Sequence, residues 1–250
     1  MLESLGVWNE MTTLERPAAP STEELKAISD RFEKSTPEEI LQWAVETYGF
    51  GLTMATAFGA EGCALLAMLG ATVPNGRSVH VFNLETGYQF AETLELRERI
   101  REKYGIEVEY VRAKETVAEM EARFGGPIYG TNPDMCCGIR KVAPLKDALV
   151  GYNAWITAIR RDQTSHRAQA GIVEWDAKFN LVKINPLANW SAGEVWAYIA
   201  INEAPYNPLH DQGFPSIGCW PCTRAIAGDE DERSGRWASS AKMECGLHTR

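Results

Sequence analysis

The sequence predicts an α/β fold in which a mostly parallel, open sheet is flanked by helices. Apolar segments typical of strands alternate with helical segments between residues 51 and 204, and this alternation is typical of parallel sheets. The chain has 250 residues, of which 45% are hydrophobic and 24% charged, as in an ordinary globular α/β protein. No internal repeat is visible, and disordered, collagen-like and low-complexity classes are excluded.

Two N-terminal helices are predicted from capping signals. Ser21 and Thr36 each precede a glutamate by three residues, and Pro37 occupies a first helical position,. Along the rest of the chain, strand and helix patterns alternate. Strands are predicted at 51–58, 78–84, 106–110 and 154–159, and helices at 61–69, 89–104 and 115–124.

A hairpin and one more helix complete the predicted fold. The segments 172–175 and 179–184 flank a short turn, and Ser191 with Glu194 opens a helix that ends at Ile201,. After Pro205 the chain becomes polar and rich in loops. We therefore expect an extension at 1–20, an α/β nucleotide-binding part at 21–204 and a loop-rich C-terminal segment at 205–250, all in one integrated domain.

The net charge of the chain restricts the kinds of partner that it can bind. The formal net charge is −9, which argues against broad electrostatic binding to nucleic acid. The N-terminus lacks the basic start and apolar run of a secretory signal, and no apolar stretch approaches the length of a membrane span,. We therefore expect a cytoplasmic protein whose anionic ligand, if it has one, meets locally clustered arginine and lysine.

Six cysteines suggest metal binding or thiol chemistry rather than disulfides,. Cys136, Cys137, Cys219 and Cys222 offer four thiolates, which suits one zinc ion or one [4Fe–4S] cluster,. The adjacent pair does not fit the usual spacing of a zinc knuckle, whereas neighbouring residues can each reach a different iron. A role for the second pair alone, as a redox dithiol, stays open.

The remaining two cysteines lie in different settings. Cys245 lies in a polar segment close to the C-terminus, which favours an accessible, reactive thiol,. Cys63 lies on an apolar helix, where burial is the simpler interpretation,. No resolving cysteine would then remain on this chain.

Candidate anion sites follow the predicted strands. The turns at 56–62 and 84–88 each join a strand to a helix, where free backbone N–H groups can hold a phosphate, although neither turn is a Walker A loop,. Arg160, Arg161 and Arg167 follow another strand and are candidate anion ligands,. The candidate contacts on the turns are Phe58, Gly59, Ala60, Glu61, Leu84, Thr86 and Gly87.

Several motifs together resemble the assimilatory sulfonucleotide reductases, and within them the iron–sulfur branch of adenylyl-sulfate (APS) reductases. The resemblance extends from about residue 53 to residue 248. It rests on Cys-Cys-Gly-Ile-Arg-Lys at 136–141, Arg-Arg-Asp-Gln at 160–163, Pro-Tyr-Asn at 205–207, Gly-Cys-Trp-Pro-Cys-Thr-Arg at 218–224 and Glu-Cys-Gly-Leu-His at 244–248.

The resemblance implies a fold like that of the adenine nucleotide alpha hydrolases, of PP-loop type, and a set of roles. Cys136, Cys137, Cys219 and Cys222 would hold a [4Fe–4S] cluster, and Lys141 would link that cluster to the substrate. Arg167, Arg233 and Arg236 would contact the phosphosulfate, and His248 matches the terminal histidine of the family. Thioredoxin, or a glutaredoxin-like dithiol, would supply the electrons, and a homo-oligomer is left open.

The implied reaction is attack of Cys245 on the sulfur of APS, in the pathway of sulfate assimilation and cysteine biosynthesis. His248 would help to keep Cys245 ionised. The chain departs from the family pattern at Gly62 and at Tyr88, and both places are candidates for a preference for 3′-phosphoadenylyl sulfate (PAPS). Reduction of PAPS or of both nucleotides, an RNA-thiolating enzyme and a zinc-stabilised binding module are the alternatives.

Overall fold

A six-stranded sheet forms the centre of the fold, with the strand order β3-β2-β1-β4-β6-β5. Residues 20–228, 230–238, 242 and 244–248 are described by the structure, a computed structural model of the chain. All neighbouring strands run parallel except β5, which pairs antiparallel with β6. The strands are β1 (Leu52–Thr56), β2 (His80–Glu85), β3 (Val108–Arg112), β4 (Ala154–Ile156), β5 (Val173–Asp176) and β6 (Leu181–Ile184).

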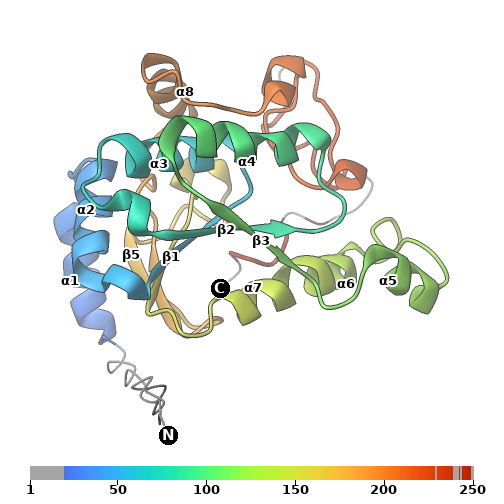
Figure 1. Ribbon diagram of the computed structural model, residues 1–250, viewed down its shortest axis with the longest axis horizontal. Helices are drawn as coiled ribbons and strands as arrows, with labels where there is room; N and C mark the ends of the chain where they lie inside the picture. Colours follow the sequence, from blue (N-terminus) through green and yellow to red (C-terminus); the bar gives the residue numbers. More distant parts are fainter. Residues whose placement is uncertain (1–19, 229, 239–241, 243, 249–250) are drawn as a thin grey trace, which may run out of the picture.

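Helices cover both faces of this sheet (Figure 1). The α-helices are α1 (Thr22–Phe32), α2 (Pro37–Tyr48), α3 (Ala60–Ala71), α4 (Ala91–Tyr104), α5 (Val117–Phe124), α6 (Pro133–Cys137), α7 (Ala143–Ala148) and α8 (Ala192–Ile201). A π-helical segment, Gly138–Val142, joins α6 to α7.

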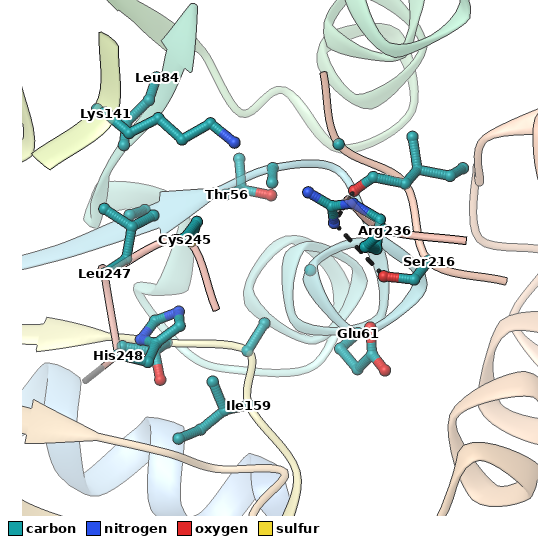
Figure 2. Close-up of a pocket in the computed structure, with 18 of the residues that line it drawn as sticks. Thr56, Glu61, Leu84, Lys141, Ile159, Ser216, Arg236, Cys245, Leu247 and His248 are labelled. Carbon is teal, nitrogen blue, oxygen red and sulfur yellow. Dashed lines mark hydrogen bonds between the residues drawn. The ribbon is translucent and has the colours of Figure 1, made fainter. Parts of the chain in front are cut away.

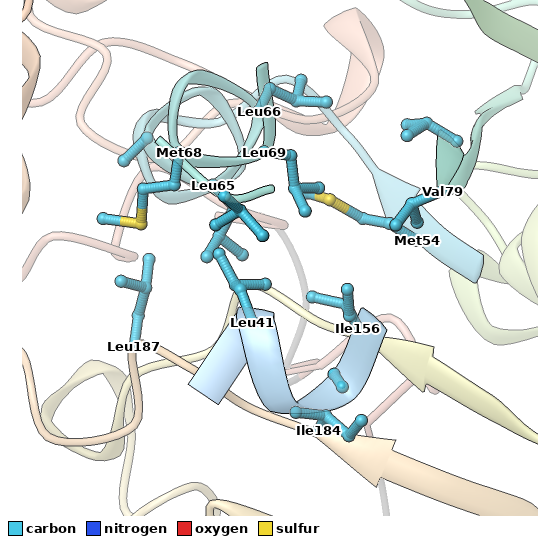
Figure 3. Packing of buried hydrophobic residues seen from close by; sticks show 14 of the residues in the cluster. Leu41, Met54, Leu65, Leu66, Met68, Leu69, Val79, Ile156, Ile184 and Leu187 are labelled. Carbon is cyan, nitrogen blue, oxygen red and sulfur yellow. The ribbon is translucent and has the colours of Figure 1, made fainter. Parts of the chain in front are cut away.

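Alternating side chains on the strands divide the core into two parts. On β4, Ala154 and Ile156 join the larger cluster, whereas Trp155 joins the smaller one. The larger cluster includes residues from α1, α2, α3, α4 and α8, and part of it is seen in Figure 3. The smaller cluster combines Leu145 of α7 with residues of the sheet and with Leu247 from the C-terminal segment. The end of the chain therefore packs on the face that α7 covers.

Local signals in the sequence account for most of these boundaries. Ser21, Thr36 and Ser191 each form the capping box expected of them, and Gly105 ends α4 with a φ of 67°, in the left-handed region that glycine tolerates. The hairpin is confirmed. The fourth strand is shorter than expected, because β4 ends at Ile156, and the helical stretch from 133 to 148 was not predicted.

The segment after Pro205 packs back on the α/β part. Cys219 forms an isolated bridge with Gln89, and the backbone N–H of Trp220 donates to Tyr88 O at 2.8 Å. Within the described ranges, no helix combines the length and apolar character needed to cross a membrane.

Candidate active site

A cavity of about 200 Å³ lies where β1, β2 and β4 end (Figure 2). Its walls come from the turn after β1, the turn after β2, the segment after β4 and the C-terminal segment. Gly59 is the N-cap of α3 and makes no side-chain cap, so the first N–H groups of this helix are available to an anion,. The predicted turn residues Gly59, Ala60, Glu61, Leu84 and Thr86 line this cavity, which we call the main cavity.

One end of the main cavity carries a thiol and three basic side chains. Cys245 and His248 line it together with Lys141, Arg167 and Arg233, whereas Arg236 lines the cavity on the side of Ser216 and Glu61 (Figure 2). Lys141 points into the cavity from the π-helical segment, and Cys245 approaches from the C-terminal segment (Figure 2). Burial would lower the pKa of Lys141, but the thiols of Cys219 and Cys245 outweigh it and raise that pKa. This end therefore suits an anion that must meet a thiol.

Glu244 holds the segment that carries Cys245. Its carboxylate accepts from Arg167 Nε at 3.0 Å and from a second Arg167 nitrogen at 2.9 Å, and it lies 3.4 Å from Arg233. The Glu244 side chain is only 6% exposed. Burial would raise the pKa of Glu244, but Arg167 and Arg233 hold it below its ordinary value, so the carboxylate is charged at neutral pH.

His248 is a neutral imidazole in this site. Its ring stacks on Trp155 with the centroids 5.8 Å apart. Burial, together with Arg167, Lys183 and other cations, holds the pKa of His248 well below its ordinary value. The expectation that His248 helps to keep Cys245 ionised stays a prediction. His248 Nδ1 has no hydrogen-bond partner among the described residues and remains available to a ligand.

The other end of the main cavity is acidic. Arg160 is 1% exposed and is surrounded by the carboxylates of Glu61, Asp162 and Glu232. Glu61 and Glu232 line the cavity. Figure 2 places Glu61 across the cavity from Lys141. The cavity is therefore basic at one end and acidic at the other.

A second, smaller cavity unites the four remaining predicted cysteines, and we call it the thiol cavity. Cys136 and Cys137 come from α6, and Cys219 and Cys222 from the turn that contains Trp220. Burial raises the pKa of Cys136 to about 12, and the other three thiols add to this. Lys141 lines this cavity as well as the main one.

The donor set of the thiol cavity can be compared with the two metal groups that suit four cysteines. A single zinc ion needs ligands that converge on one point. Across the part of the chain that the structure describes, no three His, Cys, Asp or Glu side chains are placed to hold such an ion. A four-iron cluster has separate corners, so thiolates spread around one cavity can each bind a different iron. The four cysteines supply the thiolate donors that such a cluster takes.

Several expected contacts lie elsewhere. The guanidinium group of Arg160 is buried outside the cavity lining, and the partly exposed Arg161, also outside it, pairs with Glu33 at 2.7 Å. The expectation that these two arginines face an anion is corrected, because three carboxylates surround Arg160, and Arg161 is engaged by Glu33, Asn189 and the carbonyl of Ala170. The side chain of Phe58 is fully buried in the core with a φ of 54°. Gly87 faces Val117 and Arg140 instead of the main cavity.

Tyr88 belongs to the thiol cavity and not to the nucleotide side. Its ring contacts Tyr129 and Trp220 edge to face, with centroids 5.3 and 6.3 Å apart. The idea that Tyr88 sets a preference for PAPS is thereby corrected, whereas Gly62 does line the main cavity.

Sequence reasoning missed several residues at the main cavity, and three of them are titratable. Glu232 and His210 line the cavity, and Glu244 secures Cys245. Glu244 could have been found from its place directly before the reactive cysteine. His210 and Glu232 lie in loops whose residue pattern does not indicate a binding site.

Known proteins resemble this chain over most of its length. Residues 51–225 match the model of the "Phosphoadenosine phosphosulfate reductase domain". A phosphoadenosine 5′-phosphosulfate reductase of Gloeobacter violaceus is 47% identical, with 90% of this chain and 93% of the relative covered. An adenosine 5′-phosphosulfate reductase of Salinibacter ruber is 41% identical, with 92% and 90% covered.

Solved structures agree with this similarity. The crystal structure of a phosphoadenylyl-sulfate (PAPS) reductase from Candida auris, as a phosphate complex, has a TM-score of 0.71 and 31% identity, and the match covers 81% of this chain and 97% of that one. An FMN adenylyltransferase of Candida glabrata, with a TM-score of 0.54 and 16% identity over 81% of this chain and 65% of that one, shares the fold.

Proposed function

Because the chain belongs to the phosphoadenosine phosphosulfate reductase domain family, we propose that it is an oxidoreductase that reduces APS to sulfite and AMP. The observation that carries this proposal is that Cys245, four basic side chains and a neutral histidine line the same cavity. Relatives with the corresponding name, such as that of Salinibacter ruber, favour APS as the substrate.

The first step forms one bond and breaks another. The Cys245 thiolate attacks the sulfur of APS, the bond between that sulfur and the phosphate oxygen breaks, and AMP leaves with the electron pair. Lys141, Arg167, Arg233 and Arg236 lower the cost of bringing an anionic sulfonate against a thiolate. The product on the enzyme is a cysteine S-sulfonate.

The second step requires an external dithiol such as thioredoxin or a glutaredoxin-like protein. One of its thiolates attacks Cys245 Sγ, sulfite leaves, and the second thiol of the partner resolves the mixed disulfide. The partner is thereby oxidised by two electrons and Cys245 is restored. Cys63 does not serve as a resolving thiol in this scheme, because it is fully buried and burial raises its pKa to about 12.

The proposal includes a [4Fe–4S] cluster held by Cys136, Cys137, Cys219 and Cys222. When bound, such a cluster supplies a fixed anionic group beside Lys141. Iron and acid-labile sulfide should accompany the purified protein and disappear in Cys137→Ser, while Cys63→Ser keeps both. Zinc bound in place of iron would contradict this part of the proposal.

A cytoplasmic location, a place in cysteine biosynthesis and the division of the chain at residues 20 and 204 stay predictions. The free thiols of the described cysteines suit a reducing compartment,. PAPS is the second candidate substrate, favoured by the relative of Gloeobacter violaceus and by the Candida auris structure.

Intact-protein mass spectrometry tests the proposed function directly. The protein is incubated anaerobically with APS or with PAPS in the absence of thiols, and any sulfonate adduct is located by peptide mapping. We expect an adduct on Cys245 with APS, none in Cys245→Ser, and an unchanged adduct in Cys63→Ser. A protein with its metal content intact that forms no adduct with either nucleotide would refute the proposed function.

A further inference from the structure

The two ends of the main cavity differ in charge. At the basic end, Arg167 and Arg233 pair with a single carboxylate, that of Glu244, and Lys141 adds a third positive charge. At the acidic end, Arg160 pairs with the three carboxylates of Glu61, Asp162 and Glu232, and Arg236 is the second cation on this side of the cavity (Figure 2). The basic end is thus net positive, and the acidic end is net negative.

The carboxylates of the acidic end face the cavity, and the arginine lies behind them. Arg160 Nε donates to Glu61 Oε1 at 2.9 Å, and another Arg160 nitrogen donates to Glu232 at 3.1 Å. Glu61 is 15% exposed and Glu232 36%, whereas Arg160 is 1% exposed. Arg160 therefore orients the two carboxylates without offering its own charge to a ligand.

Glu61 keeps one oxygen for a ligand. Gln163 also donates to Glu61 Oε1, at 2.8 Å, so both hydrogen bonds of this carboxylate go to the same oxygen. In the described part of the chain, Glu61 Oε2 accepts no hydrogen bond. It can therefore accept one from a hydroxyl group of a bound nucleotide.

The position of Cys245 fixes how a nucleotide must lie. The sulfonate has to reach Cys245 at the basic end, so the ribose and base extend toward the turn after β1 and the acidic end. A ribose hydroxyl can donate to a carboxylate, whereas a phosphate monoester carries a charge of about −2 near neutral pH and is repelled. Dinucleotide-binding folds use the same contrast, with a carboxylate for a ribose hydroxyl and an arginine for a ribose phosphate.

We propose that Glu61 and Glu232 form an acidic wall that selects a nucleotide with a free 3′-hydroxyl group and rejects one with a 3′-phosphate. This inference rests on the proposed function and names the residues that decide between its two candidate substrates. Gly62 then needs no part in rejecting the 3′-phosphate.

Equilibrium binding tests the acidic wall without requiring turnover. AMP and adenosine 3′,5′-bisphosphate are titrated calorimetrically into the full chain with its metal content as purified. Wild type should bind AMP at least about tenfold more tightly than the bisphosphate, and Glu61→Gln and Glu232→Gln should each narrow this preference about tenfold.

Asp162→Asn is the matched control. Asp162 contacts the same arginine and loses the same charge, but it is 50% exposed and lies outside the cavity lining, so solvent screens it. We expect the preference of Asp162→Asn for AMP over the bisphosphate to stay within about twofold of the wild-type preference. If Glu61→Gln does not fold, the more exposed Glu232→Gln decides the question.

The outcomes separate the two proposals. An unchanged preference in folded Gln variants, or a wild type that prefers the bisphosphate, would overturn the acidic wall and leave the proposed reductase in place. Binding of neither nucleotide by wild type would overturn both. A preference that narrows in the two Gln variants and not in Asp162→Asn supports the inference.

Discussion

Replacing Glu244 with glutamine should strengthen nucleotide binding and slow the chemical step. The carboxylate of Glu244 neutralises Arg167 and Arg233, which would otherwise face the phosphosulfate. Two unit charges about 6 Å apart repel by about 3 kcal/mol at an effective dielectric constant of about 20. Because Glu244 is only 6% exposed, solvent screens little of this repulsion, and its removal should tighten AMP binding by up to about 100-fold.

The same substitution should loosen the segment that carries Cys245. Glutamine keeps an acceptor oxygen but loses the charge-assisted hydrogen bonds from Arg167 at 2.9 and 3.0 Å, at a cost of about 1–3 kcal/mol. Gln163 still holds Arg167 in place, because its side-chain oxygen accepts from that guanidinium. Single-turnover sulfonation of Cys245 by APS should therefore slow while AMP binding improves.

Calorimetric titration with AMP and quenched single-turnover mass spectrometry measure the two effects separately. Glu230→Gln is the control, because Glu230 pairs with Arg224 at a more exposed place in the same region, and we expect it to change neither quantity. If Glu244→Gln binds AMP more weakly than wild type, Glu244 orients the arginines instead of competing with the substrate, and the reasoning is wrong.

Three further predictions concern the nucleophile, the core and the terminal histidine. Cys245→Ser should bind AMP as wild type does in calorimetry but release no sulfite in a colorimetric assay. Gly70→Ala should destabilise the protein by about 1–3 kcal/mol in urea, because the new Cβ would lie 2.5 Å from Tyr104 Cβ; Gly193→Ala, which meets only a 3.9 Å contact, should not. Since the pKa of His248 is lowered, the folded state binds fewer protons than the unfolded state below the ordinary value of 6.5. Stability should therefore fall as the pH drops below that value, and less so in His248→Asn, as thermal melts at several pH values would reveal.

Local signals made the fold predictable, because they act within a few residues. Ser21, Thr36 and Ser191 form their caps with glutamates three residues on, so the sequence contains both partners of each interaction. The helical stretch around Cys136 was missed since it is short and continues through a π-helical turn. Such a turn depends on its tertiary surroundings more than on its own residues.

The direction of side chains could not be predicted in the same way. Arg160 and Arg161 follow a strand end, as a phosphate ligand would, but carboxylates from distant parts of the chain pair with both arginines outside the cavity lining. Arg167 lies further along the same loop, where no strand pattern fixes its direction, yet its side chain reaches the main cavity. Its partner there, Glu244, comes from the far end of the chain, so the sequence around Arg167 contains no sign of it.

Lys141 and Cys219 line both the main cavity and the thiol cavity, and this shared wall has a thermodynamic consequence. Any group bound in one cavity changes the field at the Lys141 ammonium, and through it the free energy of binding in the other. Such coupling is reciprocal by necessity. If a group bound in the thiol cavity alters the affinity for a nucleotide by some factor, the nucleotide must alter the affinity of the thiol cavity for that group by the same factor. A bound nucleotide can therefore stabilise or labilise that group without contacting it.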